Sequence, residues 1–317
     1  MRAAEIRTPG QAPVVVDRAT PSPAGDRALV RVLAAPITPL DLLCASGTSY
    51  FGRPATPYVP GVQGVGLLTD RPVWFPTSAG MAPGDGAMAE YAAVAADSLV
   101  DLPAGTDPVA FAALGLSAVA ALMALTDRGE LSPGERVLVL GAGGVVGQAA
   151  VRLARLYGAS HVIAAARSPR ARERATRAGA DTVVPLTTGD LPELTAALTE
   201  AADGPVDLVI DPLFGVPAAA AAATLRPGGR LVNLGSSAAE TTPLTSSTIR
   251  AYSLRLLGYT NNELTPAQRA KAIRVIATHS AANELAVDHE TLPLTEAATG
   301  WTRQATGTSA GRVVLTT

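Results

Sequence analysis

The pattern of hydrophobic and polar positions changes near Asp107. Before this residue, short strand-like segments at 12–17, 27–34 and 64–69 stand among many prolines and glycines. After it, Ala-rich stretches with a helical period alternate with short runs of β-branched residues. The first third of the chain is therefore predicted to be β-rich, and most of the remainder to be built from β-α units.

The region after Asp107 contains six predicted strands with helical patterns between them. The strands span 136–140, 161–165, 182–184, 206–210, 230–234 and 253–258, and the helices span 145–157, 168–178, 191–202 and 217–225. The turn at Arg226-Pro-Gly-Gly229 is predicted to end the last of these helices. This alternation predicts an α/β fold with a doubly wound parallel sheet. A further helix at 266–282 and a strand at 311–315 follow.

A glycine-rich turn joins the strand at 136–140 to an amphipathic helix. The predicted cofactor-binding residues of this turn are Gly141, Gly143, Gly144, Val145, Val146 and Gly147. Backbone N–H groups and a helix N-terminus in this context can bind a pyrophosphate. We assign Gly141 to the tight turn, either Gly143 or Gly144 to close approach of the ligand, and Gly147 to helix packing. The alternative is a structural turn without a ligand.

Basic residues stand where many dinucleotide sites carry an acidic one. An Asp or Glu about 20 residues after the last glycine binds the ribose 2′-hydroxyl in NAD sites. This chain has Arg167 there, followed by Ser168 and, four residues further, Arg172. A guanidinium can bind a 2′-phosphate through two hydrogen bonds, and the Ser168 hydroxyl can add one more. The sequence therefore predicts NADPH as the cofactor, with Arg174 as part of a solvated helix face.

Composition excludes several classes of protein. The 317 residues are 48% hydrophobic and only 16% charged, with a formal net charge of −2. This balance argues against a basic nucleic-acid-binding surface and against an acidic disordered chain. The single cysteine, Cys44, can form no internal disulfide and no cysteine-rich zinc site.

The chain is expected to lie in the cytoplasm and to bind no membrane. Its start has a charge at Glu5 and a proline at Pro9, and no apolar segment of a targeting signal follows. The longest uncharged apolar run, 109–125, is mostly alanine and contains Gly115 and Ser117. A buried helix is the preferred interpretation of this run, although its length is close to that of a membrane span.

Six segments along the chain share one resemblance. They are Pro39-Leu-Asp41-Leu-Leu-Cys-Ala-Ser-Gly47, Tyr58-Val-Pro-Gly61-Val-Gln-Gly64-Val-Gly66, Ala89-Glu90-Tyr91, Gly115-Leu-Ser117-Ala118, Pro293-Leu-Thr-Glu296-Ala-Ala298 and Gly311-Arg-Val-Val-Leu315. Together they resemble the medium-chain dehydrogenase/reductase superfamily, in its zinc-free, zeta-crystallin-like quinone oxidoreductase branch. No single segment is specific by itself.

The resemblance implies two domains. A split GroES-like catalytic domain would comprise 1–115 and 262–317, and a Rossmann domain at 116–261 would be inserted into it. A cleft between them would hold the nicotinamide and a small-molecule substrate. Within that arrangement, Ser117 is expected near the nicotinamide ribose or carboxamide. The backbone of Leu234, Gly235 and Ser236 is expected near the nicotinamide ring.

The resemblance also implies that no zinc is bound. The positions that hold zinc ligands in related dehydrogenases carry Thr38, Val62 and Gln63, which do not form a plausible ligand set. The three histidines are interpreted as structural. The chain also departs from the quinone reductase pattern at Thr38, at Leu43 and at Ser49, where Tyr50 is displaced by one position. These positions face the substrate in the family, so the substrate is expected to be unusual.

We therefore predict an NADPH-dependent reductase of an electron-poor C=C bond in an enone, an enoyl group or a quinone. Hydride addition places negative charge on a carbonyl oxygen, which needs hydrogen-bond donors. Thr38, Ser49 and Tyr50 are the predicted catalytic donors, with water or the cofactor ribose as alternatives. The segment Trp74-Phe75 is predicted either to help shape the substrate side or to lie in the core.

Two alternatives remain at this stage. One is an enoyl-thioester reductase or another biosynthetic tailoring enzyme. The other is a non-redox protein on the same fold, either a cyclase or an NADPH-sensing module. A homodimer is also expected, because the apolar edge strand at 253–258 can pair with a second copy.

Overall fold

The computed structural model describes all residues from Met1 to Thr317. They divide into two compact units, which we call the split unit and the inserted unit. The split unit joins Met1–Gly115 to Thr265–Thr317, and the inserted unit comprises Leu116–Leu264. The chain returns to the split unit slightly later than the predicted boundary at 261–262.

A six-stranded parallel sheet forms the centre of the inserted unit. Its spatial order is β10-β9-β8-β11-β12-β13. The strands are β8 (Arg136–Leu140), β9 (His161–Ala166), β10 (Thr182–Pro185), β11 (Val206–Asp211), β12 (Leu225–Asn233) and β13 (Arg255–Gly258). The direction of chain progression reverses between β8 and β11. The carboxyl ends of these two strands therefore flank the switch point at which such sheets bind ligands.

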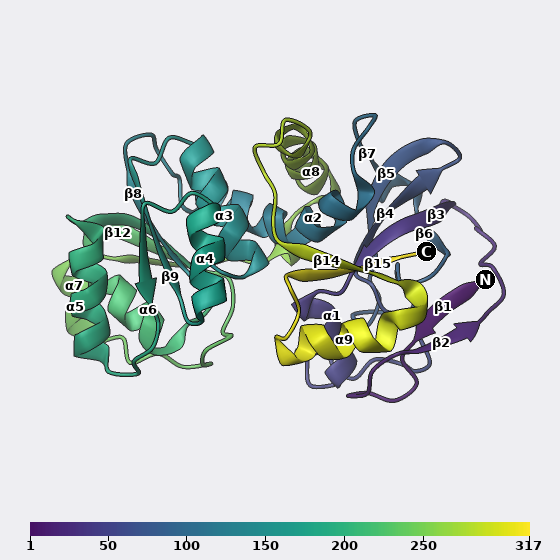
Figure 1. The fold of residues 1–317 in the computed structure, drawn as a ribbon, viewed down its shortest axis with the longest axis horizontal. Helices are drawn as coiled ribbons and strands as arrows, with labels where there is room; N and C mark the ends of the chain where they lie inside the picture. Colours follow the sequence, from purple (N-terminus) through teal and green to yellow (C-terminus); the bar gives the residue numbers. More distant parts are fainter. The chain divides into compact units, whose positions relative to one another are not determined.

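Helices cover both faces of this sheet. Figure 1 shows α3 (Val145–Leu156) and α4 (Pro169–Arg177) on one side, and α5 (Leu191–Ala202) and α6 (Gly215–Ala222) on the other. Helix α7 (Ser246–Ala251) precedes β13, and the 3-10 turn η3 (Asn261–Glu263) follows it. Because both faces are covered, the apolar side chains of β8 and β9 are buried. This is the predicted doubly wound α/β architecture.

The boundary between α6 and β12 differs from the prediction. The helix ends at Ala222, and Leu225 already pairs with Val206 in the sheet. The predicted turn at 226–229 lies inside β12, where the register shifts. The prediction was wrong because Leu225 is buried in the core, and Gly228, with a φ of 74°, allows the strand to bulge.

The split unit contains a seven-stranded sheet that is mostly antiparallel. Its order is β14-β15-β3-β4-β5-β7, and β6 also pairs with β3. The strands are β3 (Arg27–Pro36), β4 (Gln63–Leu68), β5 (Arg71–Pro76), β6 (Tyr91–Ala95), β7 (Val100–Asp101), β14 (His289–Pro293) and β15 (Arg312–Thr316), with the 3-10 turn η1 (Ala96–Ser98) before β7. Strand β15 lies against β3, with Val314 opposite Pro36. The last strand of the chain thus completes a sheet that the first third begins.

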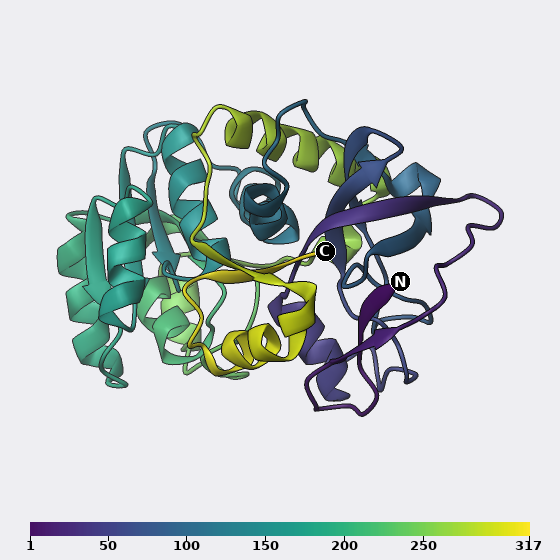
Figure 2. The same cartoon turned by 45° about the vertical axis from the view of Figure 1, so that its right-hand side comes forward.

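Smaller elements surround this sheet. Strands β1 (Arg2–Glu5) and β2 (Val14–Asp17) form a separate hairpin. Helix α9 (Ala297–Thr306) contacts β2 and α1 (Pro39–Ser46), as Figure 2 shows for its yellow ribbon beside the purple N-terminal segment. Helix α8 (Pro266–Ala281) contacts β7 and η1, and the 3-10 turn η4 (Leu294–Glu296) precedes α9.

Helix α2 (Pro108–Met123) is interrupted at Gly115, whose φ of 34° and ψ of −132° are not helical. A Cβ there would lie 2.1 Å from Oε1 of Gln63, so glycine is required. The π-helical segment η2 (Ala124–Arg128) continues it. The combined helix is long and apolar enough to cross a membrane, but 61% of its most apolar window is buried within the molecule. The burial agrees with a core helix.

Candidate functional site

The glycine-rich turn connects β8 to α3 at the carboxyl edge of the parallel sheet. Gly141 has a φ of 61°, which favours glycine. Its carbonyl oxygen accepts a 2.9 Å hydrogen bond from the N–H of Gly144. Gly147 packs on the same turn, where a Cβ would lie 2.4 Å from the Gly141 carbonyl oxygen. The turn therefore needs glycine at both positions.

Gly143 and Gly144 have different surroundings. A Cβ at Gly143 would lie 2.3 Å from the Cβ of Ala171, so this glycine lets α4 pack on the turn. A Cβ at Gly144 would approach only the Gly141 carbonyl oxygen, at 3.3 Å. Gly144 is also the N-cap of α3, provides no side-chain cap and precedes Val145 and Val146 of the first turn. It is therefore the glycine beside open space, at a helix N-terminus suited to an anion.

A buried glutamine supports this turn. Gln148 is only 3% exposed, and its Nε2 donates a 3.1 Å hydrogen bond to the carbonyl oxygen of Gly143. Gln148 is not among the site residues predicted from the sequence. The signal was a polar residue on the apolar side of α3, directly after the last glycine.

The predicted phosphate-binding residues lie together after β9. Arg167 is exposed, and its carbonyl oxygen accepts a 3.3 Å hydrogen bond from Nη1 of Arg172. Ser168 is the N-cap of α4, where its Oγ accepts a hydrogen bond from the N–H of Ala171. Since Ala171 packs on Gly143, these basic residues are adjacent to the glycine-rich turn. The combination fits a dinucleotide that carries a 2′-phosphate.

Two further loops border the switch point. A Cβ at Gly141 would lie 3.1 Å from Cδ2 of Leu213, so the loop after β11 lies against the glycine-rich turn. The loop after β12 is tied to it, because the N–H of Leu234 donates to the Asp211 carbonyl oxygen at 2.7 Å. Gly235 and Ser236, which we predicted near the nicotinamide, belong to this second loop.

Ser236 and Ser117, two of the predicted cofactor-binding residues, lie in different parts of the inserted unit. Ser236 donates its hydroxyl to Oε2 of Glu240 at 2.6 Å. Ser117 lies in α2, just after the interruption at Gly115, and belongs to the inserted unit. Their roles toward the cofactor stay predictions.

Thr38 has a local role that the sequence analysis did not expect. It is the N-cap of α1, and its hydroxyl donates a 2.6 Å hydrogen bond to Oδ2 of Asp41. The same carboxylate oxygen accepts the backbone N–H of Thr38 at 2.8 Å. In this structure the Thr38 hydroxyl is therefore directed to Asp41, as part of a helix cap. Its role as a substrate donor stays a prediction.

Asp41 links α1 to the chain before β4. Its Oδ1 accepts hydrogen bonds from the N–H groups of Gly61 at 3.0 Å and Val62 at 2.9 Å. Burial raises the pKa of Asp41 and the hydrogen bonds from Thr38, Val62 and Gly61 oppose that shift. This carboxylate therefore fixes the backbone at Val62, one of the positions that the resemblance assigns to zinc ligands.

Trp74 and Phe75 lie in the core. Both are fully buried in β5, and Nε1 of Trp74 donates a 3.0 Å hydrogen bond to Oε1 of Gln63. The prediction that this segment shapes the substrate side was wrong, and the core interpretation is correct. Phe75 belongs to the hydrophobic core of the split unit, and Trp74 is held by buried Gln63.

Ser49 and Tyr50 are neighbours with opposite exposure. Ser49 is 7% exposed, and its Oγ accepts the N–H of Phe51 at 3.1 Å. Ser49 also forms a side-chain hydrogen bond with Cys44. Burial raises the pKa of the Cys44 thiol to about 11. Tyr50 is 75% exposed, with its ring centroid 4.3 Å from that of Phe51. The three predicted donors therefore differ in exposure, and their roles toward the substrate stay predictions.

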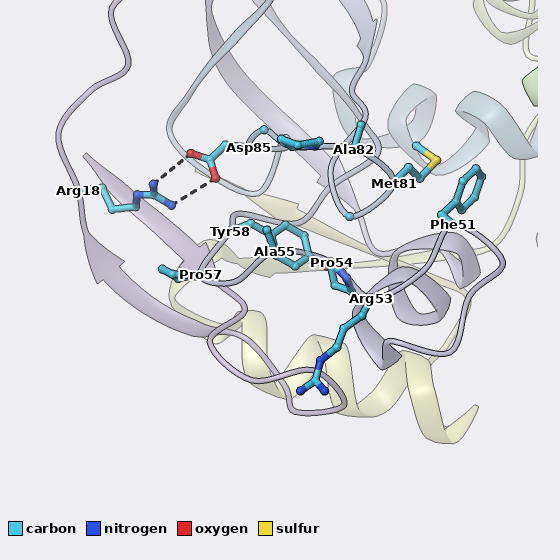
Figure 3. A pocket seen from close by; sticks show the side chains of 13 residues that line it. Arg18, Phe51, Arg53, Pro54, Ala55, Pro57, Tyr58, Met81, Ala82 and Asp85 are labelled. Carbon is cyan, nitrogen blue, oxygen red and sulfur yellow. Dashed lines mark hydrogen bonds and ion pairs between the residues drawn. The ribbon is translucent and has the colours of Figure 1, made fainter.

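The split unit contains a pocket of about 520 Å³. Figure 3 shows Phe51 and Met81 at one end and the ion pair of Arg18 with Asp85 at the other, with Tyr58 between them. The Tyr58 hydroxyl is buried without a hydrogen-bond partner. None of the three predicted donors lines this pocket.

No group of three or more His, Cys, Asp or Glu side chains is placed to hold a metal ion. Two of the histidines have local partners: Nδ1 of His279 lies 2.7 Å from Oε2 of Glu284, and Nδ1 of His289 lies 3.1 Å from the carbonyl oxygen of Val287. These contacts agree with structural roles for both.

Comparisons with known proteins show which family this chain belongs to. A family described as zinc-binding dehydrogenase matches residues 145–278. The quinone oxidoreductase of Rattus norvegicus is 30% identical over 231 residues, covering 69% of this chain and 67% of that protein. The crystal structure of the quinone oxidoreductase from Thermus thermophilus, also solved in complex with NADPH, is 28% identical, covers 100% of both chains and has a TM-score of 0.85.

A much larger protein matches as well. One of the proteins that make up the phenolphthiocerol/phthiocerol polyketide synthase of Mycobacterium tuberculosis is 30% identical over 313 residues. The match covers 92% of this chain but only 14% of that synthase protein. The chain therefore spans a small part of this relative's length.

Proposed function

Because this chain belongs to the quinone oxidoreductase family of the medium-chain dehydrogenase/reductase superfamily, we propose that it is an NADPH-dependent reductase of activated C=C bonds in enones, enoyl groups or quinones. The observation that carries the proposal is the glycine-rich turn with Arg167 and Arg172 beside it. Relatives named quinone oxidoreductases, and the Thermus thermophilus structure in complex with NADPH, support it.

The chain's own residues would bind and orient the cofactor. The N-terminus of α3 and the backbone at Gly144 would hold the pyrophosphate. Arg167, Ser168 and Arg172 would hold the 2′-phosphate. When bound, NADPH supplies hydride to the carbon β to a substrate carbonyl.

The carbonyl oxygen then needs a hydrogen-bond donor. Thr38, Ser49 and Tyr50 are the candidates in this chain, and Thr38 would have to turn its hydroxyl from Asp41 toward the substrate. The structure offers no obvious general acid among the predicted residues, so we assign the final proton to solvent.

The synthase similarity favours a second candidate function. Most of this chain is similar to part of a polyketide synthase protein, at the same identity as to the rat quinone oxidoreductase. Reduction of an enoyl thioester is therefore the alternative substrate class. The hydride chemistry would be unchanged, and only the group that activates the C=C bond would differ.

Three further properties belong to the same proposal. The enzyme would work without zinc, since Thr38, Val62 and Gln63 stand at the ligand positions. It would form a homodimer through β13, an edge strand in which Leu256 is 44% exposed. It would act in the cytoplasm.

The deciding experiment measures NADPH oxidation with a panel of enones, quinones and enoyl thioesters, followed by product analysis. We expect turnover with at least one class, unchanged by a chelator, and weaker turnover with NADH. NADPH binding without reduction of any acceptor would favour the non-redox alternative, either a cyclase or an NADPH-sensing module. Absence of NADPH binding would refute the cofactor assignment. Mass measurement in solution at micromolar concentration tests the dimer.

A further inference from the structure

The carboxylate of Asp211 holds the loop that follows β11. Asp211 is fully buried at the carboxyl end of that strand. Its Oδ1 accepts hydrogen bonds from the N–H groups of Leu213 at 2.9 Å and Phe214 at 2.8 Å. One carboxylate oxygen therefore fixes two consecutive peptide groups of the loop.

Asn233 holds the loop that follows β12. It lies opposite Asp211 in the pairing of β11 with β12. Its Nδ2 donates to Oδ2 of Asp211 at 3.0 Å and to the carbonyl oxygen of Gly235 at 2.9 Å. The two side chains thus form one hydrogen-bonded pair, and each of them also bonds the backbone of the loop that follows its own strand.

The backbone at Phe214 is strained. Its φ of 57° and ψ of −156° lie in a region that is essentially reserved for glycine. Such a conformation persists only where the surroundings hold it, and it concentrates at ligand sites. Here the hydrogen bond from the Phe214 N–H to Asp211 provides that restraint.

The strand order shows which part of a dinucleotide these loops would meet. Arg167 after β9 is placed for the adenosine 2′-phosphate, and the turn after β8 is placed for the pyrophosphate. The next strands across the sheet are β11 and then β12. A dinucleotide that continues in the same direction brings its nicotinamide half to the loops after these two strands.

We infer that Asp211 and Asn233 are a positioning pair, which fixes the backbone at 213–214 and 234–236 against the nicotinamide half of the cofactor. The inference rests on the proposed function for its cofactor, but it concerns residues that the sequence analysis did not identify. The sequence signal was a polar residue at the end of each of two buried strands.

The test compares binding of the whole cofactor with binding of its adenosine half alone. In Asp211→Asn, one carboxylate oxygen is replaced by an NH₂ group, which cannot accept a hydrogen bond. In one orientation this NH₂ faces the loop N–H groups, and in the other it faces Nδ2 of Asn233, so a hydrogen bond is lost in either case. Asn233→Leu is the second variant, and it removes every hydrogen bond that Nδ2 donates to Asp211 and Gly235. Asp207→Asn is the matched control, because Asp207 lies at the other end of β11, where it accepts the N–H of Arg136 at 2.8 Å and pairs with Arg226. Binding of NADPH is compared with binding of 2′,5′-ADP, which lacks the nicotinamide.

We expect both pair variants to bind NADPH about tenfold more weakly or worse, which is the scale of one lost buried hydrogen bond. Their affinity for 2′,5′-ADP stays within about twofold of wild type, and Asp207→Asn changes neither. Equal weakening of both ligands, or unchanged NADPH binding, overturns the inference. Because the experiment measures binding, it decides the role of the pair even if the protein reduces no acceptor. Failure to reduce any acceptor would count only against the proposed activity. A wild-type protein that binds no NADPH overturns both.

Discussion

The Thr38 hydroxyl donates a 2.6 Å hydrogen bond to the Asp41 carboxylate, and the two residues form a capping box at the start of α1. Replacing Thr38 with Val keeps the shape and removes the hydroxyl. We expect a loss of about 1 kcal/mol in the free energy of unfolding, as for other N-caps. Thr38→Ser keeps the cap and is the control. Denaturant unfolding measures both. A sharp fall in turnover of Thr38→Val at unchanged stability would instead support Thr38 as a substrate donor.

Arg167→Ala should change cofactor preference. Loss of a charge-assisted contact to the 2′-phosphate should weaken NADPH binding by roughly 1–3 kcal/mol and leave NADH binding nearly unchanged. Arg177→Ala, at the far end of α4, is the matched control for removal of one positive charge. Fluorescence titration with both cofactors gives the comparison. Equal effects of Arg167→Ala on the two cofactors would contradict our assignment.

The two central glycines of the turn should respond differently to alanine. At Gly143, the new Cβ would lie 2.3 Å from the Cβ of Ala171, so α4 must move. We expect a loss of about 1–3 kcal/mol in unfolding free energy, typical of an overpacked contact. At Gly144, the Cβ has only one neighbour, so stability should hold while NADPH binding weakens. Thermal unfolding and NADPH titration of both variants distinguish these outcomes. Similar behaviour of the two variants would show that we have placed the open side of the turn wrongly.

Glu135 should contribute to acid sensitivity. Burial raises its pKa, but the hydrogen bonds from Arg230 and Ser132 outweigh it and hold the pKa below the usual 4.5. The unfolded chain therefore binds this proton more tightly than the folded one. The stability that Glu135 provides is present above about pH 4.5 and is lost as pH falls through the folded-state pKa.

Glu135→Gln tests this dependence. The variant should be less stable than wild type at neutral pH, because Nη2 of Arg230 loses a carboxylate partner at 2.5 Å. The difference between the two proteins should shrink as the solution is acidified below pH 4.5. Urea unfolding at several pH values measures it. A difference that is constant with pH would refute the linkage.

Tyr58→Phe should leave stability unchanged or raise it by up to about 1 kcal/mol. The Tyr58 hydroxyl is buried without a hydrogen-bond partner, and an unsatisfied buried group opposes folding. Tyr91→Phe, on a partly exposed residue of β6, is the control for loss of a phenol hydroxyl. A clear loss of stability in Tyr58→Phe, measured by thermal unfolding, would mean that the hydroxyl has a partner in solution.

The local sequence pattern was sufficient to predict many helices and strands of the inserted unit. The predicted bounds of β8 and α5 agree with the structure, because each has a regular period and clear terminal signals. The glycine-rich turn was also found from its own residues. In these places, each residue's role depends on neighbours within a few positions of the chain.

The remaining features depend on residues far apart in the sequence. Trp74 is buried with Gln63 of the neighbouring strand as its hydrogen-bond partner, a contact that no local pattern reveals. Asp211 and Asn233 meet only because β11 and β12 pair in a particular register. Thr38 is the exception, since its cap is local. There the expectation of a catalytic role took precedence over the helix-start signal of a threonine, a proline and an aspartate.

The pairing of β3 with β15 sets an order on synthesis at the ribosome. The register places Val314 opposite Pro36, so the part of β3 at 34–36 that β6 does not pair lacks its neighbour until β15 has emerged. The inserted unit is complete in sequence by Leu264 and can fold before that moment. During this interval the split unit carries an incomplete sheet with an open edge, the kind of surface on which nascent chains associate. Protection of that edge during translation is therefore a requirement that this topology places on the cell.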